Sequence, residues 1–430
     1  MKLAIHGGKK VRDKPFPAYV TVGEEEKKAV CDVIDSGCLS KYLGAFHDQF
    51  NGGVQVRALE QEWAKYFGVK HAIAVNSNTS GLNCAVGATG IEPGEEVIVS
   101  PYTMCASATA PLVYNAIPVF ADIEEEYYCL DPEDIERKIT SKTRAIIVVD
   151  IFGQPYNSKA INAIAKKYDL IIIEDAAQAP GAKLNGKYAG TLGDIGVFSL
   201  NYHKHIQSGE GGVIVTDNDE LAEKCRLIRN HAEAVVEGKG VTDLRNMIGF
   251  NYRMTEIEAA IARIQLTKLS KLIKDRIENV RYFEQKISSL PFISTPKVRQ
   301  GAEHVYYAHA CKFDEKSAGV SRDVFIEAVR AELPYTQLRE QEGVKLGSGY
   351  VKPLYLQPMF QNKIAYGSKG YPFSESNSNY EKGICPVTER MHYSKLFSHE
   401  FILPSMQKSD IDDVVMAFEK VWSSRLIISA

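Results

Sequence analysis

Short apolar runs separated by amphipathic stretches characterise the chain from residue 70 to residue 216. Seven of these runs are rich in Val and Ile and too short for helices, so we predict buried strands at 71–76, 96–100, 117–122, 144–150, 170–175, 196–200 and 211–216. Stretches between them, such as 131–139 and 158–169, have the amphipathic spacing of helices. This alternation predicts a mostly parallel sheet covered on both faces, with ligands beyond the carboxyl ends of its strands.

The pattern changes after residue 252. Apolar residues then follow the three-and-four spacing of long helices, over 257–264 and again over 280–290. We also expect a strand at 304–313, a helix capped by Ser321 over 321–333, a loop-rich segment over 341–395 and a closing helix over 409–422. The sequence therefore predicts a large α/β domain over 1–252, with an N-terminal segment, and a smaller α+β domain over 253–430.

Composition narrows the class of protein. Hydrophobic residues make up 45% of the chain and charged residues 24%, which is ordinary for a soluble globular protein. A net charge of -3 gives no reason to expect a nucleic-acid partner. No apolar run has the length of a membrane span, and the eight scattered cysteines contain no CxxC pair, which suits reduced thiols. We expect a cytoplasmic protein without a membrane or nucleic-acid partner.

One polar cluster, "SLNYHKHIQSGEGG" at 199–212, permits three kinds of chemistry. His203 and His205 suggest a metal site, but no HExxH and no further Cys/His cluster lies near them, so we expect no metal. A strand follows the glycines, whereas a nucleotide loop must open a helix, so the glycines indicate a tight turn with close backbone approach. The third candidate is a reactive amine at Lys204.

Two other stretches offer partners for such an amine. Asp175 and Gln178 follow a very apolar strand, where a carboxylate is costly unless it meets a cation, and the protonated ring nitrogen of pyridoxal phosphate (PLP) is one such cation. Asn78, Thr79 and Ser80 stand between a strand and a helix, a position suited to a phosphate. A helix cap at Thr79 and a capping or ion-paired role for Asp175 are the alternatives.

Taken together, "NSNTSGL", "PYTMCASA", "VDIFGQP", "EDAAQAPGA", "GDIGVFSLNYHKHIQSGEGG" and "GFNYRMTEIEAAI" resemble the ordered motifs of the DegT/DnrJ/EryC1/StrS aminotransferases. The resemblance runs from about residue 4 to the C-terminus. It implies a fold-type I PLP-dependent transferase, similar to aspartate aminotransferase, with a large α/β domain and a smaller C-terminal α+β domain. It also implies transfer of an amino group from glutamate or glutamine to a keto-sugar or keto-cyclitol.

The resemblance assigns roles residue by residue. Lys204, placed by Ser199 and Glu210, corresponds to the lysine that carries PLP, and His203 and His205 flank it as loop or pocket residues. Asp175 is expected to face the ring nitrogen of PLP and Gln178 its phenolic oxygen. The expected phosphate contacts are Asn78, Thr79, Ser80 and Ser199, with Asn251 reaching in from the neighbouring subunit of an obligate homodimer with shared active sites.

Two positions depart from the family pattern. Asn78 stands where glycine is usual, and asparagine tolerates unusual backbone angles. Met104 stands where an aromatic ring commonly stacks on PLP. Methionine can pack on a ring through its polarizable sulfur, and Tyr102 is an alternative stacking residue.

The substrate pocket is expected to involve the loops 41–56, 231–246 and 341–380. Their hydroxyl-binding candidates are Tyr42, His47, Asn51, His231, Tyr350 and Tyr355, and the cations available for a nucleotide diphosphate are Lys41, Lys239 and Arg253. Arg322, Arg330 and Arg339 fall on a pattern typical of a solvated helix, so we expect a ring ketone rather than an α-keto acid as acceptor. A PLP-dependent sugar dehydratase and a non-catalytic sensor are the alternative functions, and retention of Lys204 and Asp175 disfavours both.

Overall fold

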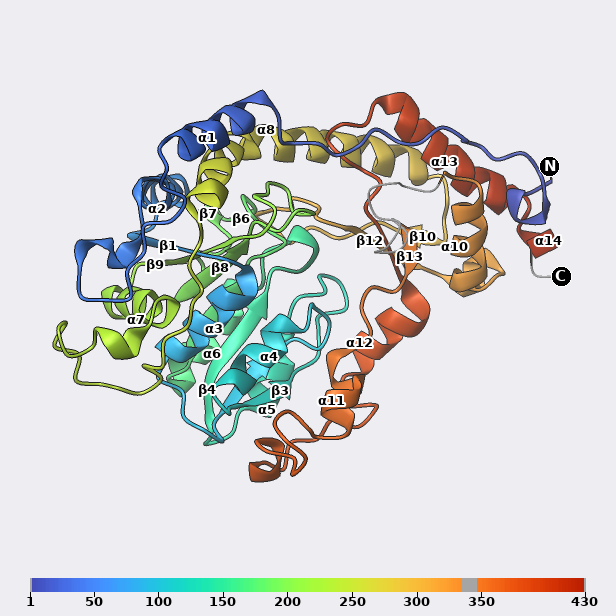
Figure 1. Cartoon of the computed structure of the whole chain (residues 1–430). Helices are drawn as coiled ribbons and strands as arrows, with labels where there is room; N and C mark the ends of the chain where they lie inside the picture. Colours follow the sequence, from blue (N-terminus) through green and yellow to red (C-terminus); the bar gives the residue numbers. More distant parts are fainter. Residues whose placement is uncertain (1, 335–345, 429–430) are drawn as a thin grey trace.

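A seven-stranded sheet forms the centre of the larger part of the protein in a computed structural model, which describes residues 2–334 and 346–428 (Figure 1). Its strand order is β1-β9-β8-β5-β4-β2-β3, and only β9 runs antiparallel to its neighbours among these paired strands. The strands are β1 (His71–Val75), β2 (Glu96–Val99), β3 (Ile117–Phe120), β4 (Thr143–Val149), β5 (Ile171–Asp175), β8 (Ile195–Ser199) and β9 (Gly212–Thr216). All seven predicted strands are confirmed.

Helices cover both faces of this sheet because successive strand residues point to opposite faces. Ile173 packs into a core beneath α3 and α4, whereas its neighbour Ile172 packs into a separate core with α5 and α6. The covering helices are α2 (Val54–Phe67), α3 (Asn78–Ala88), α4 (Ala106–Val113), α5 (Pro132–Lys138), α6 (Ser158–Tyr168) and α7 (Asp219–Arg229). The predicted helices at 131–139 and 158–169 are confirmed as α5 and α6.

One long helix, α8 (Glu256–Ile287), joins the two parts of the molecule. Thr255 caps it by accepting from the backbone N–H of Glu258, whose side chain accepts from Thr255 N in return. The first half of α8 packs against α2, and its second half contributes Val280 and Phe283 to the core of the second sheet. Figure 1 shows α8 running along the top of both parts.

The second sheet has four antiparallel strands in the order β10-β12-β14-β13. Its elements are β10 (Ile293–Ser294), β12 (His309–Phe313), β13 (Leu346–Ser348) and β14 (Leu396–His399), with α9 (Glu315–Ala318), α10 (Arg322–Ala331), α13 (Lys408–Ser423) and α14 (Arg425–Ile428). The predicted helices around 321–333 and 409–422 are confirmed, and Ser321 caps the first. The predicted strand at 304–313 begins only at His309, because Tyr306 has a φ of 50° and interrupts the extended backbone.

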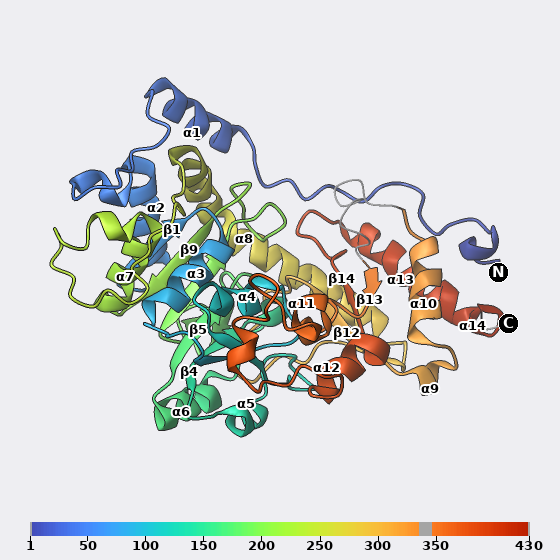
Figure 2. The same cartoon turned by 60° about the horizontal axis from the view of Figure 1, so that its bottom comes forward.

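Residues 350–390 leave the second sheet and pack against the first (Figure 2). The backbone N–H of Leu354 donates to Pro101 O (2.8 Å), and those of Val387 and Thr388 donate to the carboxylate of Asp122. The α-helices of this segment are short, namely α11 (Pro358–Gln361) and α12 (Pro386–Arg390), and a π-helical turn (Met391–Lys395) follows it. The predicted loop-rich character is confirmed over 346–395, and residues 341–345 lie outside the described part.

The N-terminal segment runs beside α8 from the second sheet to α1 (Glu24–Asp35) (Figure 1). Leu3 and Phe16 are buried in the core of the second sheet, and the Arg12 guanidinium pairs with Asp410 and Asp413 at 2.8 Å each. Residues from both sides of position 252 therefore share each core. Whether 1–252 and 253–430 fold as separate domains stays a prediction.

The remaining elements are short. A three-stranded sheet comprises β6 (Lys183–Leu184), β7 (Lys187–Tyr188) and β11 (Ala302–Glu303), and 3-10 turns lie at Ala4–His6, Asp48–Asn51, Ile151–Gly153, Ala232–Ala234, Leu354–Leu356 and Phe373–Glu375. Among the described residues, none of the helices combines the length and apolar character needed to cross a bilayer.

Candidate active site

A cavity of about 170 Å³ lies beyond the carboxyl ends of β4, β5 and β8. It brings together seven of the nine predicted site residues, namely Asn78, Thr79, Met104, Asp175, Gln178, Ser199 and Lys204. Sequence reasoning missed Ser77, Thr103 and Asn201, which also line it. Two predicted residues, Ser80 and Asn251, do not line it in this chain.

Asp175 ends β5 and is 4% exposed. Its Oδ2 accepts from Ser107 Oγ (2.7 Å), and its Oδ1 accepts from Ala177 N (3.2 Å) and, more weakly, from Asn78 Nδ2 (3.4 Å). Burial raises the pKa of Asp175, while these hydrogen bonds and the charge of Lys204 oppose the rise. All three hydrogen-bond donors are neutral, so the carboxylate retains the capacity to stabilise a cation in the cavity.

Lys204 lies in the turn after β8, where its backbone N–H donates to Asn201 O (2.9 Å). The residue is buried, and its Nζ lies 4.4 Å from the ring centroid of Tyr307, a distance at which a cation is attracted to the ring face. Tyr307 belongs to the irregular segment before β12, which was expected to be strand. The amine and the Asp175 carboxylate thus meet one cavity from adjacent strands.

The two histidines beside Lys204 differ in position. His203 lines the cavity, whereas His205 is buried and its Nε2 contacts Val305 O at 3.0 Å. Burial lowers the pKa of His205 well below its ordinary value. Neither belongs to a group of three metal-ligating side chains within the described ranges. His205 therefore supports the turn, and His203 forms part of the cavity wall.

The N-terminus of α3 forms another part of the cavity wall. Ser77, not Thr79, caps this helix by accepting from Ser80 N (3.1 Å), so the capping alternative for Thr79 is wrong and its side chain is exposed to the cavity. The hydroxyl of Ser80 donates to Asn76 Oδ1 (2.7 Å), which orders the turn from outside the cavity. A Cβ at Gly212 would lie 2.6 Å from the Ser77 carbonyl carbon, so this glycine permits the close approach predicted for it.

Asn78 is the first residue of α3 and has no positive φ. Its amide donates to Val197 O (3.2 Å) as well as to Asp175. The expected tolerance for unusual backbone angles is therefore not needed here, and the side chain instead links α3 to β8.

Gln178 connects the cavity to the C-terminal part of the chain. Its Oε1 accepts from Phe152 N (2.7 Å), and its Nε2 donates to Tyr350 Oη (3.0 Å). Met104 is 54% exposed at the cavity edge. Tyr102 is fully buried and packs edge-on against Tyr350 with ring centroids 5.9 Å apart, so it does not wall the cavity as an alternative to Met104.

Asn251 is exposed, and its Oδ1 accepts from Arg253 Nε (2.7 Å). It does not contribute to the cavity of its own chain. Its expected role at the phosphate of a partner subunit stays a prediction.

None of the hydroxyl-binding candidates predicted on the pocket loops lines the cavity, and among them Tyr350 comes nearest by accepting from Gln178, which does line it. Tyr42 is buried against Arg229, Asn51 accepts from that same guanidinium, His47 accepts from Gln49 N, His231 lies against Gly44, and Tyr355 donates to Glu389. The predicted cation Lys239 pairs with Glu223 (2.6 Å), and Lys41 is exposed.

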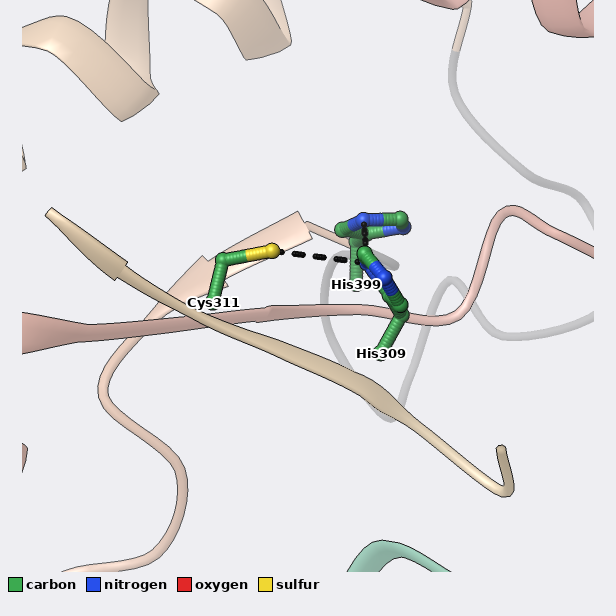
Figure 3. Close-up of side chains that lie close together, drawn as sticks. All are labelled: His309, Cys311 and His399. Atoms are coloured by element: carbon green, nitrogen blue, oxygen red, sulfur yellow. Dashed lines mark hydrogen bonds between the residues drawn. The ribbon is translucent and has the colours of Figure 1, made fainter. Parts of the chain in front are cut away.

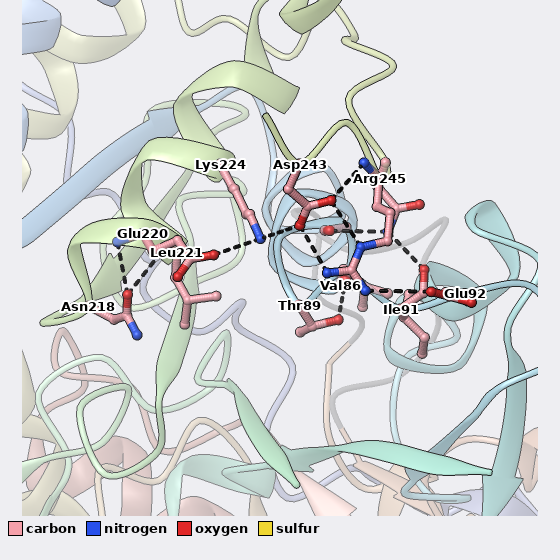
Figure 4. A network of polar contacts seen from close by, with 12 residues as sticks. Val86, Thr89, Ile91, Glu92, Asn218, Glu220, Leu221, Lys224, Asp243 and Arg245 are labelled. Atoms are coloured by element: carbon pink, nitrogen blue, oxygen red, sulfur yellow. Dashed lines mark hydrogen bonds and ion pairs between the residues drawn. The ribbon is translucent and has the colours of Figure 1, made fainter. Parts of the chain in front are cut away.

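An ion-pair network holds the end of the 231–246 loop (Figure 4). Asp243 pairs with Lys224 (3.3 Å) of α7 and with Arg245 (2.9 Å), which also reaches Glu92 (3.5 Å). These contacts fix the end of the loop to α7 and to the turn after α3, and none of the residues involved lines the cavity.

Arg322 corrects the expectation of a solvated helix face. It is 3% exposed, and its Nη1 donates to the carbonyls of His392 and Leu396 at 2.8 Å each. The π-helical turn and the start of β14 place these carbonyls around the guanidinium, which the helical pattern alone does not reveal. Arg330 is exposed as expected, and Arg339 lies outside the described residues.

Comparison with known proteins extends these observations. Residues 22–419 match the model of the DegT/DnrJ/EryC1/StrS aminotransferase family. The spore coat polysaccharide biosynthesis protein SpsC of Bacillus subtilis is 30% identical over 407 residues, which cover 93% of this chain and 95% of that protein. GDP-perosamine synthase of Caulobacter vibrioides is 39% identical over 311 residues, covering 71% of this chain and 79% of the synthase.

Solved structures give the same picture. The aminotransferase from Psychrobacter cryohalolentis superposes with a TM-score of 0.79 at 27% identity, covering 95% of this chain and 99% of that one. The DesV protein of S. venezuelae superposes with a TM-score of 0.76 at 27% identity, covering 93% and 94% of the two chains.

Proposed function

The chain belongs to the DegT/DnrJ/EryC1/StrS aminotransferase family, and we propose that it moves an amino group from glutamate or glutamine to the ketone of a sugar ring, with Lys204 and Asp175 as its catalytic residues. It is a PLP-dependent aminotransferase of fold type I, as the sequence predicts. The observation that carries the proposal is the single cavity into which a buried amine and a buried carboxylate project from adjacent strands.

The residues of the cavity fit PLP. The hydrogen-bond donors given above for Asp175 are neutral, so a protonated ring nitrogen would add a charged donor to this buried carboxylate. Ser107 holds the carboxylate in place from α4. When bound, PLP supplies an electron sink for the charge that develops at the donor's α-carbon. Asp175 keeps the ring nitrogen protonated, which maintains that sink.

Lys204 carries the cofactor and then acts as general acid and base. Its amine moves the proton between the donor's α-carbon and the C4′ position of the cofactor. Burial of the residue and the nearby Tyr307 ring keep the amine in a site with little water, where proton transfer is directed.

The remaining contacts follow from the same geometry. The N-terminus of α3 presents Thr79 and the backbone amides near Asn78 to the phosphate, and Ser199 adds a hydroxyl from β8. Ser80 acts indirectly by ordering the Ser77 turn. The second hydrogen of Gln178 Nε2, beyond the one donated to Tyr350, is available for the phenolic oxygen, while Met104 lies at the cavity edge beside the ring.

The acceptor is a polyhydroxylated ring ketone. The relatives named GDP-perosamine synthase and a structure of DesI in the presence of its TDP-sugar product point to a nucleotide-linked sugar, with a free keto-cyclitol as the alternative. Arg322 is already saturated by carbonyl oxygens and Arg330 is exposed, so neither is placed to hold the distal carboxylate of a keto acid. Retention of both Lys204 and Asp175 favours transamination over dehydration or a sensor role.

A homodimer with shared active sites completes the proposal. Asn251 is exposed outside its own cavity, which leaves it available to the phosphate of a partner subunit. Mixing Lys204→Ala protein with an inactive Asn251 variant should restore part of the activity, because one hybrid site carries both native residues. Absence of recovery after verified subunit exchange would count against a shared site.

All eight cysteines are free thiols, which suits a cytoplasmic location.

The test is an amination assay on purified protein loaded with PLP. We expect visible absorbance that glutamate or glutamine bleaches, and restoration of that absorbance by keto-sugars or keto-cyclitols but not by common α-keto acids. Borohydride reduction and peptide mapping should place the pyridoxyl group on Lys204, with Lys183 as an internal control that stays unlabelled. Efficient exchange among ordinary amino acids without any ring ketone accepted would overturn the proposed acceptor.

A further inference from the structure

The second sheet contains a closed cluster of side chains with metal-ligating atoms, far in sequence from the cavity motifs. His309 and Cys311 stand two residues apart on β12 and so share one face of the sheet, and His399 pairs with His309 from the adjacent β14. His309 Nδ1 lies 2.8 Å from His399 Nε2 and 3.4 Å from Cys311 Sγ (Figure 3). The three residues are 2%, 0% and 1% exposed, respectively.

A carboxylate orients the cluster from behind. Glu284 on α8 places its Oε1 2.9 Å from His309 Nε2. An ionised Glu284 accepts a hydrogen bond from the Nε2–H group of His309, which leaves the lone pair of Nδ1 facing Cys311 and His399. Carboxylate, histidine and cation are arranged in this order in many metal centres, where the carboxylate fixes the tautomer and ring of the ligating histidine.

Hydrogen bonding alone leaves this arrangement poorly satisfied. The single lone pair of His309 Nδ1 would have to accept from both the Cys311 thiol and the His399 Nε2–H group. In that tautomer His399 Nδ1 is a buried acceptor with no hydrogen-bond partner. A cation between the three facing atoms removes the competition for one lone pair, because each atom then donates its own electron pair to the cation.

We propose that His309, Cys311 and His399 bind a divalent transition-metal ion of the zinc class, with Glu284 as the residue that positions His309. Two imidazoles and a thiolate are the donors such ions prefer. The charges of the Cys311 thiolate and the Glu284 carboxylate together balance the two charges of the cation, so the buried site is neutral overall. Binding releases the thiol proton of Cys311 to solvent, and no change of oxidation state occurs.

The geometry needs only a small adjustment. Zinc bonds of about 2.0 Å to nitrogen and 2.3 Å to sulfur place tetrahedral ligand atoms about 3.3–3.6 Å apart. The three facing atoms here all lie within 4.8 Å of one another. The distance between the two histidine nitrogens (2.8 Å) is slightly shorter than the tetrahedral spacing, and the distance from Cys311 Sγ to His309 Nδ1 (3.4 Å) matches it. A water completes a four-coordinate site. The ion would join α8, β12 and β14 and so act as a structural link in the second sheet.

The test is metal binding by the purified, untagged protein after removal of metals by chelation. We expect one equivalent of Zn²⁺ to remain after dialysis and to raise the Tm. Co²⁺ should give the near-ultraviolet absorption of a thiolate–cobalt bond, which reports Cys311 directly. This readout does not depend on PLP or on aminotransferase activity.

Matched variants locate the site. Cys311→Ser should abolish the cobalt–thiolate band and the retained equivalent, whereas Cys225→Ser, which removes a buried cysteine from the core of the first sheet, should keep both. Glu284→Gln should weaken Zn²⁺ binding about 10- to 100-fold while leaving one equivalent at saturation. Failure of the folded wild-type protein to bind Zn²⁺ or Co²⁺, or binding that survives Cys311→Ser, would overturn the proposal, even if another variant does not fold.

Discussion

Glu174 and Asp175 are adjacent on β5, yet their carboxylates lie on opposite faces of the sheet and have different surroundings. Glu174 is fully buried, and its two oxygens accept from the backbone N–H groups of Gly190 (2.6 Å), Leu192 (2.9 Å) and Gly193 (3.1 Å). Asp175, also buried, faces a cavity and a lysine. Both carboxylates are buried, so burial does not distinguish them. Their partners do: Glu174 binds backbone N–H groups, which indicates a structural role, whereas Asp175 faces the proposed site of chemistry.

The Glu174 face contains a second buried carboxyl group. Asp150 is fully buried beside Glu174 and accepts from Tyr156 N (2.9 Å) through Oδ1, whereas its Oδ2 has no hydrogen-bond partner among the described residues. Burial and the charge of Glu174 raise the pKa of Asp150 well above its ordinary value. We therefore expect Asp150 to hold a proton that it shares with Glu174. A shared proton would satisfy this pair within the fold, whereas Asp175 faces the cavity, where the proposed cofactor would contact it.

The largest effect expected on the cavity face comes from the amine opposite Asp175. Lys204→Ala should abolish turnover, because no other buried amine lines the described cavity to carry PLP and move the proton. Steady-state amination assays measure this loss, and unchanged Tm would show that the fold is intact. Lys204→His should leave at most weak proton transfer or dehydratase activity. Substantial turnover by Lys204→Ala would contradict the assignment.

Asp175→Asn should lower kcat by several orders of magnitude while PLP still binds, because a neutral amide cannot keep the ring nitrogen protonated. Absorbance titration measures cofactor binding and pre-steady-state kinetics measures the rate. Glu174→Gln is the matched control on the opposite face, and its kcat per folded molecule should remain within a few-fold of wild type. Equal loss of activity in both variants would remove the distinction between the faces.

Glu174→Gln should instead reduce stability. An amide group cannot accept from all three backbone donors, and leaving a buried N–H unsatisfied costs about 1–3 kcal/mol. Urea unfolding followed by circular dichroism measures the free energy of unfolding. If Asp175→Asn destabilises the protein more than Glu174→Gln does, the structural role has been assigned to the wrong carboxylate.

The smallest effect concerns pH. Because the native pKa of Asp150 is raised, the native state holds a proton that the unfolded chain releases, so the Asp150 contribution to stability falls as pH rises above the ordinary carboxyl range. Asp150→Asn removes this titration and keeps a donor for Glu174. The unfolding free energy of Asp150→Asn should therefore increase relative to that of the wild type as the pH rises from about 5 to about 8. Parallel curves for the two proteins would contradict the shared proton.

The comparison also shows what sequence can predict. Runs of Val and Ile identify all seven strands of the first sheet, and the spacing between Ser199 and Glu210 places Lys204 beyond the end of β8. Ser107 could not be predicted as a partner of Asp175, because that requires knowing which side of α4 faces β5. Tyr350, in a loop-rich segment, accepts a hydrogen bond from Gln178, which lies 172 residues earlier in the sequence. No local sequence pattern indicates such a contact.

Two further errors have physical causes of the same kind. The left-handed backbone at Tyr306 shortens the strand that was expected from apolar residues, and it leaves Tyr307 beside Lys204. Arg322 looks solvated in a helical pattern, but carbonyl oxygens from the π-helical turn surround its guanidinium. Both depend on irregular backbone, which hydrophobic periodicity does not encode.

The N-terminal segment beside α8 has a consequence for biosynthesis. Leu3 and Phe16 pack into a core whose other members come from α8 and the elements that follow it, so a ribosome releases this segment long before its binding surface exists. During translation the first sheet can form while the N-terminal segment is still exposed, and the second core closes only after α13 has emerged. Chaperones that bind this segment as it is synthesised would therefore delay the last step of folding rather than the first.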